Sequence, residues 1–416
     1  MGLTMKEKQS LTRETCGRYR KSEKKGKTKI LDEFCQATGY NRKYALHLLA
    51  NWGKTEVLNV DGKMVKLKAG TAKRHKGGGR KPVYGPEVIA ALRLIRAFFW
   101  YRCGKLLAPF LRDQMAFLEA WPAFHITADI RAKLLKISPA TIDRALKEDR
   151  KKLAPRGISG TKPGNLLKKH IQVRTHYPWD DRKPGFFEVD TVHHCGDRDA
   201  GEFCLTLTAT DVASGWVELF ALLNKAQKWA FEGLTALPQL LPFPLLGIDS
   251  DNGGEFINRT LLAWCNANRI TFTRSRPYKK NDNCFVEQKN FKCVREYIGY
   301  ARLDTPSERE ALARVYRSLC PLLNYFLPTI KLITKTRVGS KVRKVYDKPM
   351  SPYQRLLLSA DFPDTVKAEL TRRYQRYNPV TLQQEVRRAV EALAELNRHK
   401  ALIRQQSLAA AALEDF

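Results

Sequence analysis

The feature that most constrains the fold of this chain is the order of strand and helix patterns in its middle third. Three strands are expected first, at residues 186–192, 203–209 and 216–222. Helices at 226–240, 255–268 and 283–300 then alternate with strands at 245–248 and 270–273. This order predicts an α/β domain in which a mixed five-stranded sheet is flanked by helices.

Three carboxylates stand at defined places in this domain. Asp190 lies on the first strand, Asp251 follows the fourth strand in a turn with two glycines, and Glu287 lies near the start of the last helix. With 42 acidic residues among 416, some carboxylate falls at any chosen position about one time in ten, so spacing alone is weak. The combination of a strand aspartate, DNGGEF after a strand and RPYKKNDNCFVEQKN before a helix is much more specific.

On these residues the chain resembles the DDE transposases of bacterial insertion sequences, whose catalytic core is like that of retroviral integrases. The resemblance covers residues 180–305 and is carried by Glu188-Val189-Asp190, by residues 249–256 and by residues 275–290. It implies an RNase H-like core in which Asp190, Asp251 and Glu287 are catalytic and bind metal. The chain lacks the His-His-Cys-Cys zinc module of retroviral integrases, and its N-terminal segment fits the transposase branch better.

The implied chemistry explains why carboxylates are needed. Two carboxylates about 4 Å apart repel by about 4 kcal/mol at an effective dielectric constant near 20, so the cluster requires cations. Mg²⁺ or Mn²⁺, two ions per active site, suits hard oxygen ligands. One ion would activate water or a 3′-OH and the other would stabilise the leaving 3′ oxygen, so no covalent protein–DNA intermediate is expected.

Charge is distributed unevenly along the chain. The formal net charge of +32 divides into +18 for residues 1–150, +7 for 151–179, −2 for 180–305 and +9 for 306–416. Basic segments on both sides of a nearly neutral centre predict nucleic acid as the partner. The resemblance implies that it is double-stranded DNA, both element ends and target. The longest apolar stretch, 234–248, is broken by prolines and is too short to span a membrane, and no secretion signal is found. A cytoplasmic, nucleoid-associated bacterial protein is expected.

Two helix-turn-helix candidates lie in the first basic segment. In the first, helices at 29–37 and 42–51 flank a turn at 38–41; in the second, a helix at 128–136 precedes one that begins at Pro139 and runs to 153. An ordinary helical hairpin is the alternative for either one. The predicted domains are an N-terminal helix-turn-helix domain (1–65), a basic Gly-rich linker (66–85), a second helix-turn-helix domain (86–153), a basic linker (154–179), the catalytic core (180–305) and a basic C-terminal domain (306–416).

The C-terminal domain is expected to combine a small β element with helices. Residues 329–348 carry seven basic residues and one acidic residue, which fits a hairpin on DNA or a plain surface hairpin. A stripe of apolar residues along 380–412 permits either a subunit contact or packing on the same chain. Since two element ends must be brought together, a homo-oligomer of at least two copies on DNA is expected.

Basic and amide side chains near these elements are the predicted DNA contacts. They are Arg42, Lys43, Arg80, Lys81, Arg144, Lys147, Lys279, Lys280, Lys289, Asn290, Lys292, Arg295, Arg337, Lys341, Arg343 and Lys344.

Several neighbours of the carboxylates have a simpler interpretation. His193 and His194 are adjacent on a strand and point to opposite faces, so a shared metal is disfavoured. Asp249 is expected to hydrogen bond at a strand end, Asp211 to cap a turn, and Glu255 to begin a helix. The nine cysteines form no CxxC pair, and their odd number argues against a disulfide framework.

The leading hypothesis is a transposase that binds element ends, cuts at the 3′ ends and joins them to target DNA. The alternatives are a metal-dependent RNase H-like nuclease without strand transfer and a DNA-binding regulator with an inactive core. Intact Asp190, Asp251 and Glu287 argue against the regulator.

Overall fold

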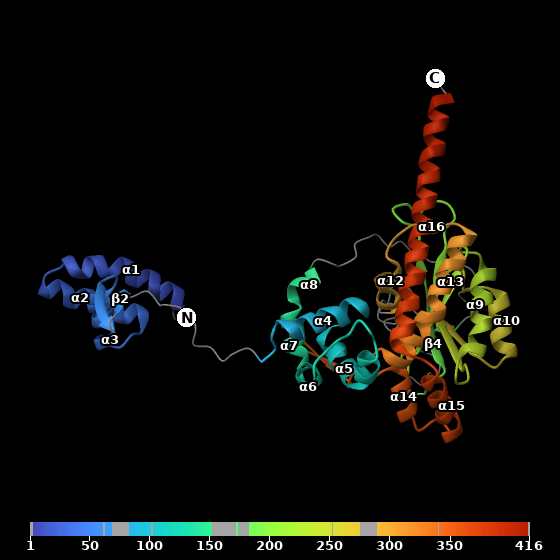
Figure 1. The fold of residues 1–416 in the computed structure, drawn as a ribbon, viewed down its shortest axis with the longest axis horizontal. Coiled ribbons are helices and arrows are strands. Elements are labelled where there is room, and N and C mark those ends of the chain that lie inside the picture. The colour runs from blue at the N-terminus through green and yellow to red at the C-terminus, as the bar shows by residue number, and fades with distance from the viewer. Residues whose placement is uncertain are drawn as a thin grey trace. The chain divides into compact units, whose positions relative to one another are not determined.

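The computed structural model describes residues 3–60, 63–68, 83–100, 103–151, 172–173, 183–251, 253–274, 289–339 and 341–414. The chain divides into two compact units, Met1–Pro82 and Val83–Phe416 (Figure 1). Among the described helices none is long and apolar enough to cross a membrane.

The first unit is a three-helix cluster followed by a hairpin. Its elements are α1 (Met5–Lys21), α2 (Lys24–Thr38), α3 (Arg42–Asn51), β1 (Thr55–Val60) and β2 (Lys63–Lys68). Gly39, with φ of 67°, ends α2, and the Asn41 side chain caps α3 by accepting from Lys43 N at 2.9 Å. The helix α3 has the predicted bounds, whereas the hairpin was missed and β2 runs three residues into the predicted linker.

The second unit begins with short helices that share one apolar core. They are α4 (Pro86–Phe98), α5 (Gly104–Glu119), α6 (Ala128–Lys136), α7 (Pro139–Ala145) and α8 (Lys147–Lys151). Gly104 lies so close to α7 that an added Cβ would be 2.1 Å from the Pro139 carbonyl oxygen. The predicted helix from Pro139 to 153 is interrupted at Leu146, which is buried and ends α7. Residues after 151 in that prediction lie outside the described residues.

A mixed sheet organises the centre of this unit, in the order β3-β8-β7-β4-β5-β6. The strands are β3 (Gln172–Val173), β4 (Phe186–His193), β5 (Leu205–Asp211), β6 (Val217–Leu222), β7 (Gly247–Ser250) and β8 (Thr271–Arg274). The five predicted strands are confirmed, and β3 adds a sixth, two-residue strand at the edge. In the sheet, β4 pairs antiparallel with β5 and parallel with β7.

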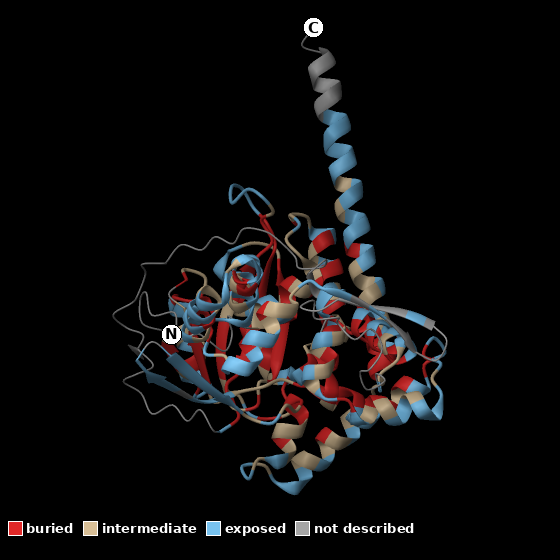
Figure 2. Ribbon diagram, turned by 90° about the vertical axis from the view of Figure 1, so that its left-hand side faces the viewer, coloured by how far each residue is buried: buried red, intermediate tan, exposed pale blue. Residues whose placement is uncertain are grey.

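Helices cover the sheet, whose strands are largely buried (Figures 1 and 2). They are α9 (Gln227–Leu240), α10 (Arg259–Ala267), the π-helix η2 (Asn290–Arg295), α12 (Glu296–Ile298), α13 (Pro306–Pro321) and the π-helix η3 (Leu322–Phe326). The predicted start of a helix at Glu255 is wrong: α10 begins at Arg259, because the Asn258 side chain caps it by accepting from Leu261 N at 2.8 Å.

The edge strand β6 is closed by side chains. Asn324 of η3 exchanges two hydrogen bonds of 2.8 Å with the backbone of Val217, and Arg309 donates to the Ala221 carbonyl at 3.1 Å. These side chains occupy backbone groups that would otherwise be open to pairing with another strand.

The remaining elements follow α13 in the chain. They are β9 (Leu332–Val338), β10 (Lys341–Tyr346), α14 (Pro352–Leu358), α15 (Asp364–Gln375) and α16 (Pro379–Glu414). Along α16, Val386 and Leu393 are buried where the helix packs on α13, so this part of the predicted apolar stripe packs on its own chain. Residues 401–407 are exposed, as the pale blue part of α16 shows (Figure 2).

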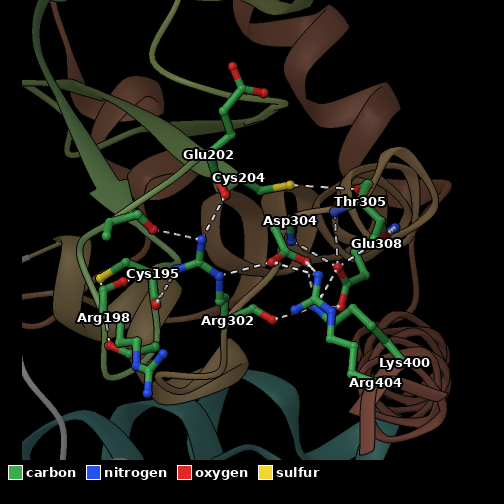
Figure 3. A network of polar contacts seen from close by, with 12 residues as sticks. Cys195, Arg198, Glu202, Cys204, Arg302, Asp304, Thr305, Glu308, Lys400 and Arg404 are labelled. Atoms are coloured by element: carbon green, nitrogen blue, oxygen red, sulfur yellow. Dashed lines mark hydrogen bonds and ion pairs between the residues drawn. The ribbon is translucent and has the colours of Figure 1, made fainter. Parts of the chain in front are cut away.

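Arg302 fastens the loop between β4 and β5 to the C-terminal helix (Figure 3). Its guanidinium donates to the carbonyls of Cys195 and Arg198 and also to those of two further loop residues, at 2.9–3.1 Å. It also pairs with Asp304, which accepts from Lys400 of α16 at 2.9 Å. The end of β4 is therefore held in place by charge-assisted contacts on the side away from β7.

Candidate active site

Asp190 lies in the middle strand of the sheet with both carboxylate oxygens engaged. Its Oδ1 accepts from its neighbour Thr191 N at 2.8 Å, and its Oδ2 accepts from Asn290 Nδ2 at 2.6 Å. These two bonds fix the direction of the carboxylate without neutralising its charge.

Asp251 follows directly from β7, the parallel neighbour of β4. Val189 and Ser250 are paired across these parallel strands. The residues that follow them, Asp190 in β4 and Asp251 just after β7, therefore lie side by side. The Asp251 Oδ1 accepts from Gly253 N at 2.8 Å, which closes the turn around the carboxylate.

The two aspartates disfavour each other's charge. Burial, together with the charge of the nearby Asp251, raises the pKa of Asp190 to about 8. Burial also raises the pKa of Asp251 to about 6, with a contribution from Glu255. A pair of partly buried carboxylates with raised pKa values is typical of a functional site.

Glu255 is a third acidic group of this cluster, which sequence reasoning assigned to a helix start. Its Oε1 accepts from Thr191 Oγ1 at 2.9 Å, and its charge raises the pKa values of both Asp190 and Asp251. The signal in the sequence was its place four residues after Asp251 in DNGGEF, since the turn at Gly253 brings the two side chains together.

Gly253 lies between two of these carboxylates. A Cβ at this position would lie 2.8 Å from both Asp251 Oδ1 and Glu255 Oε2. A side chain at this position would therefore displace the ends of both acidic side chains.

Asn290 completes the described site from the start of η2. Its amide nitrogen holds Asp190, and its Oδ1 is buried without a hydrogen-bond partner among the described residues. A buried oxygen acceptor on the residue that contacts Asp190 adds to a donor set that suits a hard cation. Single π-helical turns such as η2 are frequent at functional sites.

Several predicted site residues lie outside the described residues. They are the third carboxylate, Glu287, and four predicted DNA contacts, Arg80, Lys81, Lys279 and Lys280. The structure therefore brings together Asp190, Asp251 and Asn290 from the predicted set.

Some predicted DNA contacts are engaged within the protein. Arg295 is buried, and its guanidinium donates to the carbonyls of His193 and Gly299 at 2.6 and 3.2 Å. The Lys289 ammonium donates to the Gly215 carbonyl at 2.8 Å. Both cations therefore act within the fold of the described structure, and neither presents a freely exposed head group.

The other predicted DNA contacts that the structure describes are exposed. Lys43 and Lys292 are exposed, Arg144 and Lys147 lie on or next to α7, and Arg42 forms an ion pair with Asp32. Arg337, Lys341, Arg343 and Lys344 lie exposed on β9 and β10.

The neighbouring polar residues have clear structural contacts. The His194 ring bonds to Thr206 Oγ1 at 2.7 Å, whereas the His193 ring packs on Phe203, so the two rings have different surroundings. Asp249 accepts from Thr273 Oγ1 at 2.6 Å, and Asp211 accepts from Ser214 N at 2.7 Å in a turn.

Comparison with known proteins identifies the domain that carries this site. Residues 180–280 match the model of the integrase core domain. The chain is 35% identical over 340 residues to the uncharacterized protein y4rM of Sinorhizobium fredii, which covers 81% of this chain and 91% of that protein. This chain belongs to the same family as y4rM, and its residues 180–280 are an integrase core domain. Asp190 and Asp251 both lie within the matched integrase core.

Solved structures similar to the integrase core include two retroviral domains. The catalytic core of BIV integrase is 17% identical with a TM-score of 0.27, covering 41% of this chain and 91% of that one. The catalytic core of HTLV-2 integrase, in complex with magnesium and dimeric, is 16% identical with a TM-score of 0.27, covering 35% and 90%.

The side chains around Asp190 and Asp251, in the described part of the integrase core, have the chemistry to hold a divalent cation. In the described residues, no set of three or more His, Cys, Asp or Glu side chains is arranged to share one ion. The two aspartates and the Asn290 oxygen nevertheless offer hard ligands, and a cation there would remove the mutual repulsion of the carboxylates.

Gly253→Ala tests the close packing of the carboxylates. The added methyl group would displace the carboxylates of Asp251 and Glu255 but no backbone atom, so we expect a loss of about 1 kcal/mol in unfolding free energy, measured by urea unfolding. Gly254→Ala is the matched control, since a Cβ there meets no atom within 4 Å, and its effect should stay within about 0.5 kcal/mol. Equal effects of the two substitutions would contradict the packing described.

The raised pKa of Asp190 predicts how stability depends on pH in the absence of divalent cations. An unfolded aspartate loses its proton near pH 4, whereas folded Asp190 holds it to about pH 8. The folded state is therefore penalised progressively as pH rises from about 4 to 8. Asp190→Asn removes this penalty. The unfolding free energy of the variant minus that of the wild type should therefore increase by more than about 1 kcal/mol from pH 5 to pH 8, measured by urea unfolding in EDTA. A gain that is constant with pH would refute the assignment.

Proposed function

We propose that this protein is a transposase of a bacterial insertion sequence. It binds the ends of its element, cleaves at the 3′ ends and joins them to target DNA, with Asp190, Asp251 and Glu287 as the metal-binding catalytic triad. The observation that carries the proposal is the pair of partly buried, mutually repelling aspartates on the adjacent strands β4 and β7 of an integrase-core sheet.

The residues of the described site have distinct tasks in this proposal. Asn290 and the backbone N–H of Thr191 orient the Asp190 carboxylate, and the Gly253 N–H orients that of Asp251. Both carboxylates must be unprotonated to bind metal, so occupancy is favoured at higher pH. Mg²⁺ or Mn²⁺, as two ions, would activate the attacking oxygen and stabilise the leaving 3′ oxygen.

Charge supports DNA as the substrate. The core segment 180–305 has a net charge of −2, whereas the segments on either side are strongly basic. The basic segments would hold phosphates by non-specific attraction, and cations at the carboxylates would let the acidic site accept one. We also propose that at least two copies assemble on DNA, because two ends must be joined.

The test uses full-length protein, Mg²⁺ and end-labelled duplexes carrying the inverted repeats that flank the gene. We expect 3′-end cleavage and joined products, with rates reduced about a hundredfold or more in Asp190→Asn, Asp251→Asn and Glu287→Gln. Two exposed residues give matched controls, Asp197→Asn and Glu310→Gln, which should retain the wild-type rate.

Each alternative outcome identifies a different function. Cleavage without joined products would establish the metal-dependent nuclease instead of the transposase. Sequence-specific binding without any cleavage would establish the DNA-binding regulator. Cleavage that survives Asp251→Asn would show that the triad is wrongly assigned.

A further inference from the structure

We infer that the hairpin of β9 and β10 is a DNA-binding ribbon that the fold holds in a fixed position relative to Asp190. The inference rests on the proposed function for its substrate, duplex DNA. It adds a contact surface outside the integrase core and a physical link from that surface to the catalytic carboxylate.

The hairpin has an unusual combination of charge and exposure. Its two strands pair only with each other in the described structure, and they contain five basic residues and no acidic residue. Every described side chain of both strands is exposed, including Val338 at 79% and Ile333 at 62%. An isolated two-stranded hairpin is marginally stable in water, so a ribbon with two exposed faces is expected to have a partner.

Charge and shape favour duplex DNA as that partner. Arg337 is paired with Val342 and Arg343 with Thr336, on adjacent rungs of the ladder. Because successive side chains of a strand point to opposite faces, the two exposed arginines lie on opposite faces of the ribbon. The major groove admits a two-stranded ribbon, and there the phosphate backbones run along both long edges of the ribbon, within reach of long side chains from either face. Cations on both faces suit this position better than a flat protein surface.

The base of the hairpin is closed by a partly buried ion pair. Arg355 of α14, with a side chain only 8% exposed, pairs with Asp347 at 2.9 Å and donates to the carbonyls of Thr329 and Met350. Asp347 in turn accepts from Lys331 N at 2.6 Å. The residues before β9 and after β10 are thus locked to each other, and the hairpin cannot swing freely at its base.

The same base is fastened to the catalytic sheet. The Lys331 ammonium donates at 2.6 Å to the carbonyl of Ala213, in the turn between β5 and β6. Lys289 donates to Gly215 in that turn, and the next residue, Asn290, holds Asp190 at 2.6 Å. The turn between β5 and β6 therefore contacts both the hairpin base and Lys289, the neighbour of Asn290. DNA bound to the ribbon would thus lie at a set distance from the Asp190 carboxylate.

Removal of the ribbon charges tests the surface. Arg337→Gln/Arg343→Gln is compared with the wild type for binding of a labelled duplex of arbitrary sequence across a salt series. We expect weaker binding and a slope of log K against log salt that is smaller by about 2, because each lost phosphate contact contributes about 0.9.

Arg314→Gln/Arg317→Gln is the matched control. Both arginines are exposed on α13, and replacing them removes the same amount of positive charge as the ribbon variant does. An unchanged slope in the ribbon variant, or an equal loss in the control, would overturn the inference. A changed oligomeric state without DNA would also overturn it, by showing that the ribbon contacts a second copy. Because this assay needs no cleavage, its failure is distinguishable from failure of the proposed function.

Lys331→Met tests the link to the catalytic site. It removes the contact with Ala213 but leaves the backbone bond from Lys331 to Asp347. We expect duplex affinity within twofold of the wild type and cleavage spread over several neighbouring nucleotides of an end-labelled substrate. Thermal unfolding of the variant checks that it is folded. A single, unshifted cleavage position would overturn the link while leaving the surface in place.

Discussion

The repulsion between Asp190 and Asp251 is the constraint on which the rest of the catalytic unit depends. Their pKa values are raised because the fold partly buries both carboxylates and places them side by side on β4 and just after β7. Such an arrangement costs stability in the absence of a cation and is retained only if the surrounding structure enforces it. The bonds from Asn290 and Gly253 supply that enforcement locally.

Side chains far from the carboxylates keep the sheet in register around them. Asn324 and Arg309 cover the open edge at β6, and Arg302 clamps the loop that follows β4. Each of these side chains uses a guanidinium or amide group to hydrogen bond backbone groups that are not paired with a neighbouring strand. The π-helix η2 carries Asn290, which contacts β4, and the π-helix η3 carries Asn324, which contacts β6. Irregular helical turns therefore supply side-chain contacts to two strands of the sheet.

Much of the core could be predicted because its period-2 and helical patterns are strong and its strands are buried. Asp190 and Asp251 could be singled out because their strand positions coincide with the DNGGEF and RPYKKNDNCFVEQKN patterns, which carry the resemblance to DDE transposases. Glu255 was missed because its contact with Thr191 depends on how a four-residue turn folds back, which no periodicity records. The buried roles of Arg295 and Lys289 were missed for a similar reason: a basic residue near an acidic site suggests phosphate contact, and only tertiary packing shows that backbone carbonyls accept from it.

Direct measurement of Mn²⁺ binding tests the central claim most sharply, that Asp190 and Asp251 form one cation site. Free Mn²⁺ is followed by electron paramagnetic resonance during titration of the full-length protein at pH 8, without DNA. The account predicts binding by the wild type and by the exposed control Asp197→Asn, with affinity reduced at least about tenfold in both Asp190→Asn and Asp251→Asn. Unchanged affinity in either aspartate variant would contradict it.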